Sequence, residues 1–224
     1  MATQATVSRL LLRNVPLFAL LSEDQLAVLS TVVNRRNTRR GATIIAAGDV
    51  TDSLYIVISG KLKVAIRDKT GREVILAILG PGEHFGEMLP IDDGARSANV
   101  ISLEPCELLA LSSRDFKKCL AENFDTVMTV MRCLVRRLRQ ADRKISSLAL
   151  MDVYGRVARQ LLDMSESIDG QQVVTQKIVK HDMARMIGAS REMVSRVMKD
   201  LEAGGVIKSR GTATYLRDDI AAID

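Results

Sequence analysis

The chain has 224 residues, enough for one large domain or two modest ones, and its 47% apolar and 26% charged residues are typical of a folded protein rather than a disordered one. Aromatic residues make up 3%, with no Trp, which argues against a base-stacking platform for single strands, whereas the net charge of +5 suits a polyanionic partner. No run reaches the ~18 apolar residues that span a bilayer, and the N-terminus lacks a signal-peptide pattern, so we expect a cytoplasmic protein without membrane contact.

The first half of the chain predicts a short helix followed by β-structure. Apolar residues recur at helical spacing over residues 16–29, and Ser22 can cap a short helix there. From Arg39 to about Ser113 the chain changes to short β-rich runs, such as residues 54–58, that are separated by glycines. Strands of that length between glycine turns predict a compact antiparallel roll or barrel.

Residues 115–151 predict one long helix, because they contain no glycine or proline and their apolar residues recur at three-and-four spacing. Alternating steps of four and three form the a/d pattern of a coiled coil. We expect this apolar seam to join two copies of the chain into a homodimer, and the alternative is that the stripe packs on the chain's own β domain. The seam consists of Val127, Met131, Leu134, Leu138, Ala141, Ile145 and Leu148.

Residues 151–156 are interpreted as a hinge, in which Asp152 can cap the following helix. A second, mostly helical unit then runs to the end of the chain. It closes with a short β pair around Ile207 and residues 214–216.

A helix-turn-helix pattern lies inside this unit. Residues 180–187 have helical apolar spacing, Gly188 permits a tight turn, and Ser190 can cap a second helix that runs through Ala203. On that second helix an Arg can bond the O6 and N7 of guanine together, and a Glu can accept from the amino group of cytosine. We therefore predict double-stranded DNA as the partner, contacted by Ser190, Arg191, Glu192, Ser195, Arg196 and Lys199. The alternative is a solvated face with an intrahelical Glu192–Arg196 ion pair.

Two short segments in the middle of the β region predict a ligand pocket. Residues 85–87 and 96–98 flank a turn rich in Asp and Gly, and Gly86 lets the backbone approach a ligand. Arg96 can pair with a phosphate, Ser97 can donate to it, and Glu87 can accept from a ribose hydroxyl. An internal Glu87–Arg96 ion pair is the alternative.

The sequence resembles the cyclic AMP receptor protein/FNR family of bacterial regulators over nearly its whole length. The resemblance rests on IGASREMVSRVMKDLE at 187–202, DSLYIVISGKLKV at 52–64, GPGEHFGEM at 80–88 and DDGARSANV at 92–100. It implies an α+β fold with an N-terminal β-roll (a jelly-roll-like cyclic-nucleotide-binding domain), a long dimerisation helix and a C-terminal winged helix-turn-helix. The corresponding domains are residues 1–118, 119–151 and 152–224.

The resemblance also implies a function. Such a regulator binds palindromic promoter sites with TGTGA-like half-sites, read here by Arg191, Glu192 and Arg196, and recruits RNA polymerase. At position 195, however, the serine resembles the residue found in the FNR branch of the family. The ligand is a cyclic nucleotide held by a phosphate-binding cassette, which in this chain consists of Gly86, Glu87, Met88, Arg96 and Ser97.

The purine end departs from the cyclic AMP receptor, because Ala141 and Asp142 stand where the family has Thr and Ser. A carboxylate accepts hydrogen bonds, and guanine offers N–H donors where adenine presents an acceptor. We therefore favour cyclic di-GMP or cyclic GMP, with Arg139 and Asp142 as further ligand-binding residues, and keep cyclic AMP as the alternative. A simple i,i+3 ion pair also explains the Arg139–Asp142 spacing.

Other classes of protein fit less well. An iron-sulfur sensor needs an N-terminal cysteine cluster, but the cysteines are Cys106, Cys119 and Cys133. His84 and His181 lack matched metal-ligand partners, so we expect no metal site. No nucleophile and base pair is recognisable, which argues against an enzyme that acts on a phosphodiester and against catalytic residues. A ligand-independent regulator remains the main alternative.

Overall fold

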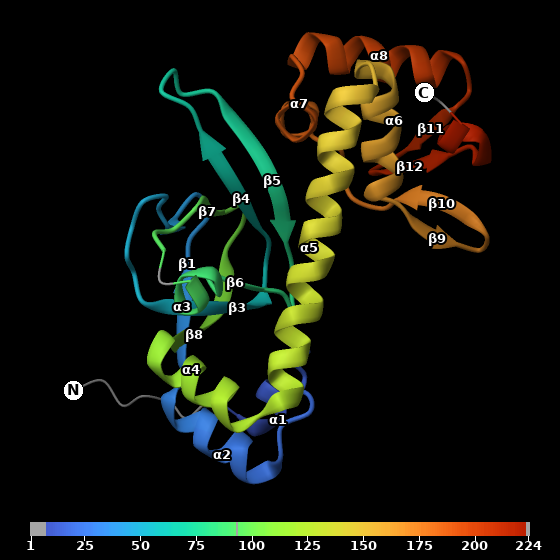
Figure 1. Cartoon of the computed structure of the whole chain (residues 1–224). Coiled ribbons are helices and arrows are strands. Elements are labelled where there is room, and N and C mark those ends of the chain that lie inside the picture. Colours follow the sequence, from blue (N-terminus) through green and yellow to red (C-terminus); the bar gives the residue numbers. More distant parts are fainter. Residues whose placement is uncertain (1–7, 93, 223–224) are drawn as a thin grey trace. The chain divides into compact units, whose positions relative to one another are not determined.

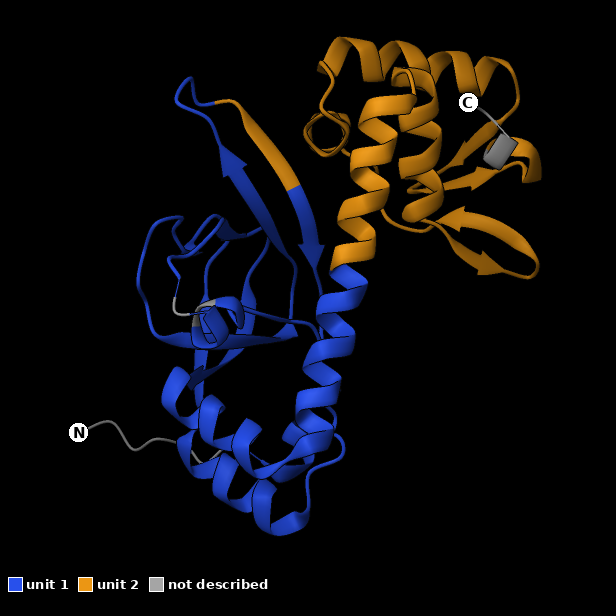
Figure 2. Cartoon of the chain, viewed as in Figure 1, with its two compact units in different colours: residues 1–71, 76–137 blue, residues 72–75, 138–224 orange. Residues whose placement is uncertain are grey.

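The computed structural model describes residues 8–92 and 94–222 of the chain (Figure 1). Contacts divide the chain into two compact units (Figure 2). Unit 1 consists of residues 1–71 and 76–137, and unit 2 consists of residues 72–75 and 138–224.

Unit 1 begins with helices α1 (Arg9–Arg13) and α2 (Glu23–Val32). Ser22 caps α2 as predicted: its hydroxyl accepts from the backbone N–H of Gln25, whose side chain accepts from the N–H of Ser22. This reciprocal pair begins the helix at Glu23 and satisfies two backbone donors that a helix N-terminus otherwise leaves open.

Two four-stranded antiparallel sheets follow, and their strands begin at Asn34, slightly earlier than predicted. The first sheet has the order β1 (Asn34–Thr38), β8 (Cys106–Ser112), β3 (Ser53–Ser59) and β6 (His84–Phe85). The second has the order β2 (Thr43–Ile45), β7 (Asn99–Ser102), β4 (Leu62–Arg67) and β5 (Glu73–Leu79).

Two hydrophobic clusters hold unit 1 together. One contains residues of both sheets, including Ile45, Leu62, Val100 and Leu108. The other packs the N-terminal helices on β3 and β8 and includes Phe18, Leu26, Leu54, Leu109 and Phe116, all of which are almost fully buried. Leu108 and Leu109 of β8 are both fully buried but lie in different clusters, since successive side chains of a strand point to opposite faces.

The prediction of one long helix over residues 115–151 is wrong in one respect, because this part of the chain forms two helices. α4 (Ser113–Glu122) and α5 (Phe124–Leu150) are separated by Asn123, whose backbone is extended. The Asn123 side-chain oxygen accepts from the backbone N–H of Thr126 at 2.8 Å and from its hydroxyl at 3.0 Å. Asn competes well for such capping positions, so a new helix begins here although no glycine or proline interrupts the sequence.

Unit 2 contains the helices and small sheet of the C-terminal part. Its elements are α6 (Val153–Asp163), β9 (Glu166–Ile168), β10 (Gln171–Val174), α7 (Lys180–Ile187), α8 (Arg191–Ala203), β11 (Ile207–Arg210), β12 (Ala213–Leu216) and the 3-10 helix η1 (Asp218–Ala222). The sheet order is β11-β12-β10-β9, and all its pairs are antiparallel. The hairpin of β9 and β10 was not predicted; it turns at Asp169 and Gly170, both with positive φ.

Caps and a separate core define unit 2. Asp152 accepts from the backbone N–H of Gly155 at 2.9 Å and so begins α6, as predicted. The core joins α6, α7, α8 and β12 through Leu161, Met183, Leu201 and Leu216. The predicted α+β class, with a β domain, a long helix and a helix-turn-helix with a small sheet, is confirmed. No helix in the described residues is long and apolar enough to cross a membrane.

Candidate functional site

The turn between α7 and α8 has the geometry that the sequence predicted. Gly188 ends α7 in the left-handed conformation, with φ 66° and ψ 40°, which a residue without Cβ adopts at no steric cost. The Ser190 hydroxyl accepts from the backbone N–H of Met193 and begins α8. Arg156 of α6 donates to the carbonyl of Ile187 at 2.7 Å, which anchors the end of α7.

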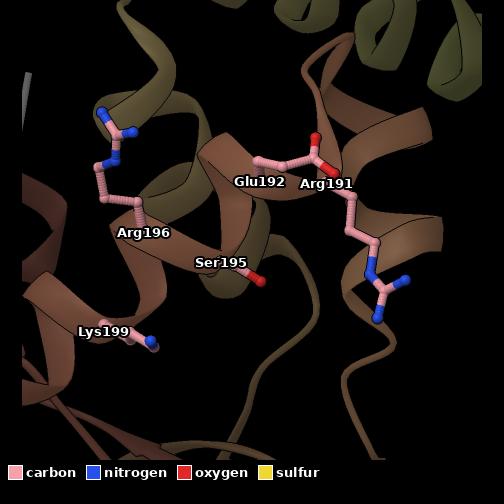
Figure 3. Close-up of a pocket in the computed structure, with 5 residues that line it drawn as sticks. All are labelled: Arg191, Glu192, Ser195, Arg196 and Lys199. Atoms are coloured by element: carbon pink, nitrogen blue, oxygen red, sulfur yellow. The ribbon is translucent and has the colours of Figure 1, made fainter.

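One face of α8 is buried and the other is exposed and charged. Val194, Val197, Met198 and Leu201 pack in the core of unit 2. The opposite face lines a hollow of about 390 Å³, in which the guanidinium groups of Arg191 and Arg196 extend to opposite sides (Figure 3). The hollow is lined by Arg191, Glu192, Ser195, Arg196 and Lys199, which are five of the six predicted DNA-binding residues.

The cationic side chains of this face, Arg191, Arg196 and Lys199, form no salt bridge within the described residues. Glu192 and Arg196 form no ion pair in the part of the chain that the structure describes, so the alternative of an intrahelical pair is wrong. Instead, the backbone N–H of Glu192, the hydroxyl of Ser190 and the positive charge of Arg191 lower the pKa of Glu192, so it is ionised and can accept hydrogen bonds. Three cationic side chains and one ionised carboxylate are thus open to a partner.

The segment between β6 and β7 gathers the predicted cassette residues. Gly86 has φ +84°, and a Cβ there would lie 2.7 Å from Nη1 of Arg96 and 2.9 Å from the carbonyl oxygen of Ser53. Only glycine fits this position, because φ is positive and there is no room for a Cβ. The Arg96 guanidinium is buried and donates to the carbonyls of Gly86 at 2.6 Å and of Thr51 and Ser53 at 2.5 Å each.

Glu87 pairs with Arg137 of α5 rather than with Arg96, so the alternative of an internal Glu87–Arg96 pair is wrong. Arg137 donates to Oε1 of Glu87 at 2.5 Å and also to the carbonyl of His84. The Glu87 side chain is 1% exposed, and its Oε2 has no hydrogen-bond partner within the described residues. A buried carboxylate oxygen without a donor is costly, so it is the place where an incoming hydroxyl is most favourable.

Sequence reasoning did not single out Arg137. It is one of several arginines on the long helix, and only the packing of α5 against the cassette distinguishes it from the others. No local signal identifies such a residue, because the contact joins residues 50 positions apart.

The remaining cassette residues lie at its outer edge. Met88 begins the short helix α3 (Met88–Asp92), and its Sδ accepts from the Ser97 hydroxyl at 3.8 Å. Met88 and Ser97 are both exposed, so Ser97 is free to turn toward a ligand. The structure therefore brings Gly86, Glu87, Met88, Arg96 and Ser97 together in unit 1.

His84 is buried beside the cassette, and its Nε2 has no partner among the described residues. Burial, and then the positive charges of Arg137 and Arg136, lower the pKa of His84 to about 4. The imidazole is therefore neutral near pH 7. No group of three or more potential metal ligands occurs in the described residues.

The two ligand residues predicted on the long helix lie further along α5 than Arg137. Arg139 and Asp142 are exposed, and no ion pair joins them or ties either one to another described residue. The alternative of an i,i+3 ion pair between Arg139 and Asp142 is therefore wrong.

Comparison with known proteins decides the family. Residues 35–123 match the cyclic nucleotide-binding domain, and residues 155–221 match the Crp-like helix-turn-helix domain. The chain is 37% identical over 177 residues to the cAMP-activated global transcriptional regulator CRP of Pasteurella multocida, covering 76% of this chain and 83% of that protein. The chain belongs to the CRP/FNR family of transcriptional regulators.

Other family members show how far the likeness extends. The cyclic AMP receptor protein of Thermus thermophilus is 36% identical over 193 residues, which covers 86% of this chain and 88% of that protein. The solved structure of the regulator CLP of Xanthomonas campestris, described as c-di-GMP responsive, has 27% identity and a TM-score of 0.72 over 87% of this chain and 99% of that one. The family consists of regulators, so the enzyme alternative is set aside.

Proposed function

We propose that this CRP/FNR family regulator reads palindromic DNA as a homodimer, under the control of a cyclic nucleotide bound at the cassette. The observation that carries the DNA-reading part is the exposed face of α8, which presents Arg191, Arg196 and Lys199 together with an ionised Glu192. Arg at such a position pairs with guanine, and Glu accepts from cytosine, which agrees with TGTGA-like half-sites. This function places the protein in the cytoplasm, and RNA polymerase is its partner by family analogy.

The exposed apolar residues of α5 support dimerisation. Met131, Leu138, Ile145 and Leu148 of the seam are 52%, 63%, 64% and 55% exposed in the single chain. A repeated apolar stripe of this kind is stable in water when a second helix covers it. Leu134, by contrast, packs partly against the core of unit 1, so at this position the stripe has a partner within the chain.

The cassette supports a cyclic nucleotide. Arg96 uses four of its five N–H groups on Thr51, Ser53 and Gly86, which leaves one N–H of Nη1 for a phosphate oxygen. The Ser97 hydroxyl lies next along the chain, and Oε2 of Glu87 is the open acceptor for a ribose hydroxyl.

A guanine ligand, cyclic di-GMP or cyclic GMP, is proposed because Asp142 and Arg139 of α5 are exposed and form no ion pair with another described residue. Carboxylate and guanidinium groups match the N–H and acceptor edges of guanine. The likeness to the c-di-GMP responsive CLP agrees with this choice. Cyclic AMP is the second candidate, since several relatives at about one third identity are described as cAMP-activated.

Fluorescence anisotropy tests the proposal. The full chain is titrated onto a TGTGA-palindrome duplex and a scrambled duplex at one salt concentration, without ligand and with cyclic AMP, cyclic GMP or cyclic di-GMP. Salt is held constant because phosphate contacts dominate affinity. We expect the palindrome to bind more tightly and one guanine nucleotide to change that affinity selectively.

The other outcomes separate the parts of the proposal. A palindrome preference that no nucleotide changes indicates a ligand-independent regulator. Binding governed by cyclic AMP, and undiminished in Asp142→Ala, contradicts the guanine assignment but leaves nucleotide control intact. Equal binding of both duplexes contradicts the proposed half-site.

A further inference from the structure

The turn of the helix-turn-helix is contacted by side chains from two other helices of unit 2. Arg156 of α6 donates to the carbonyl oxygen of Ile187, the residue before the turn, at 2.7 Å. The methyl Cδ2 of Leu148, on α5, lies 3.5 Å from the position that a Cβ on Gly188 would take. The end of α7 is therefore anchored by α6 and also touched by α5.

The contact between Leu148 and the turn crosses the hinge that the sequence predicts. α5 ends at Leu150, and the extended backbone of Asp152 separates it from α6. Leu148 thus belongs to the helix before the hinge, whereas Gly188 lies among the helices that follow it. A change of angle at the hinge must therefore alter this contact.

Leu148 is also the last residue of the apolar seam. It is 55% exposed in the single chain, and Ile145, nearly one turn earlier, is 64% exposed. The Leu148 side chain is thus in contact with the turn and still open to a second helix. A half-exposed leucine retains rotamer freedom, and a helix that packs on it removes that freedom. Covering the seam would therefore fix Leu148 against the turn.

We propose that Leu148 is a positioning residue for DNA reading, which couples the dimer seam to the turn before α8. When a second copy covers the seam, Leu148 is held against Gly188 and fixes the angle between α5 and the helix-turn-helix. Two half-sites are read together only when the two recognition helices are about one helical turn of DNA apart, ~34 Å, so this angle governs palindrome binding. This inference rests on the proposed dimer and DNA reading, and it adds the residue that links them.

Binding of the full chain to two duplexes tests the inference. One duplex is the TGTGA palindrome, and the other retains one half-site and has the second scrambled. Leu148→Ala removes the contact with the turn. Leu138→Ala is the matched control, because it is a seam leucine of similar exposure, 63%, that lies about three helical turns, ~15 Å, before Leu148.

Fluorescence anisotropy is measured without ligand and with cyclic AMP, cyclic GMP or cyclic di-GMP. Protein concentrations are chosen at which sedimentation equilibrium shows a complete dimer of each variant. The variants are compared under the condition in which the wild type binds the palindrome most tightly. Salt is held constant, because phosphate contacts dominate affinity.

We expect Leu148→Ala to bind the palindrome roughly tenfold more weakly, because its two recognition helices are no longer held at the required spacing. Its binding to the single half-site should equal that of the wild type, since the face of α8 is intact. Leu138→Ala should bind both duplexes like the wild type. Leu148→Met retains a side chain of similar volume that reaches the turn and should recover most of the loss.

The results that overturn the inference can be told apart. An unchanged ratio of palindrome to half-site affinity in Leu148→Ala refutes the coupling. An equal loss in Leu138→Ala assigns the effect to the seam as a whole, and a loss on both duplexes shows that Leu148 only stabilises the fold. A wild type that stays monomeric, or that binds both duplexes equally, refutes the proposed dimeric reading of DNA itself.

Discussion

Single residues carry the chemistry of this protein through their environment. Glu192 is held ionised by the start of its helix, whereas Glu87 is buried with one oxygen bound to Arg137 and one without a donor. In the proposed function the same side chain is an exposed acceptor for a DNA base at one position and a buried acceptor for a ligand hydroxyl at the other. Burial and available donors decide between these roles.

Arg191→Ala tests base reading. We expect specific binding to weaken by ~1–3 kcal/mol and discrimination at one base pair to relax, while the salt dependence of binding changes little. Anisotropy on the palindrome and on single-base variants of it measures both effects, with Arg114→Ala as the control. An equal loss of affinity for every sequence would show that Arg191 contacts phosphate and not a base.

His84 predicts a pH dependence of stability. Its pKa is about 4 in the folded chain and near 6.5 when unfolded, so below pH 6.5 the unfolded state binds a proton that the folded state excludes. The contribution of His84 is therefore complete above pH 6.5 and is lost as the pH falls toward 4, by roughly 3 kcal/mol in all. Denaturant unfolding between pH 4 and 7 measures it.

His84→Gln should flatten this part of the pH profile, because glutamine does not titrate. His181→Gln, at the exposed start of α7, is the control and should retain the wild-type slope. A slope that survives in His84→Gln assigns the acid sensitivity to other groups.

At the scale of elements, capping decides where helices begin and end. Ser22, Asn123, Asp152 and Ser190 each begin a helix by accepting from backbone N–H groups, and Gly188 ends one. Three of these four N-caps were predicted from sequence. Asn123 was not, because the apolar spacing continues across it and only the backbone geometry separates α4 from α5.

Gly188→Ala tests the turn of the helix-turn-helix. A left-handed residue with a Cβ costs ~1–2 kcal/mol, and the nearest atom to that Cβ is 3.5 Å away, so strain rather than collision is responsible. We expect that loss in the free energy of unfolding of the variant. Gly80→Ala is the control, since its φ is not positive and nothing lies within 4 Å of the added Cβ. Equal stability of the two variants contradicts the argument.

Ile145→Asp tests the apolar seam. The residue is 64% exposed in the single chain, so the substitution leaves the fold intact but buries a charge in each half of a dimer interface. We expect dimer affinity to fall by roughly a hundredfold or more, as two apolar contacts are lost. Sedimentation equilibrium measures it, with Ser146→Asp outside the seam as the control. A dimer that persists in Ile145→Asp places the interface elsewhere.

At the scale of the whole molecule, the two units have separate cores, one pair of clusters in unit 1 and one cluster in unit 2. The core that holds the cassette is therefore packed separately from the core that holds α8. The cassette belongs to unit 1 and the α8 face to unit 2, so a nucleotide that binds the folded chain stabilises unit 1 directly.

Ligand linkage gives a measurement at this scale. At a concentration 100 times its Kd, a nucleotide that binds only the folded state raises the free energy of unfolding by about 2.7 kcal/mol. Thermal unfolding with each nucleotide should show the shift for the true effector. Glu87→Gln should diminish it, because the ribose acceptor is weakened. A shift that is equal for all nucleotides indicates nonspecific stabilisation.

The sequence by itself determined the periodicities and the turn chemistry: the β-rich first half, the apolar stripe of the long helix, the Gly188 turn and the polar face of α8. These follow from residue spacing, which a chain carries without any fold. The tertiary structure decided the partners of the charges. Glu87 pairs with Arg137 rather than with Arg96, whose guanidinium donates to backbone carbonyls instead. Glu192 forms no ion pair with Arg196 among the described residues. Such pairs depend on distances across strands and helices far apart in the sequence, so only packing could select among the arginines.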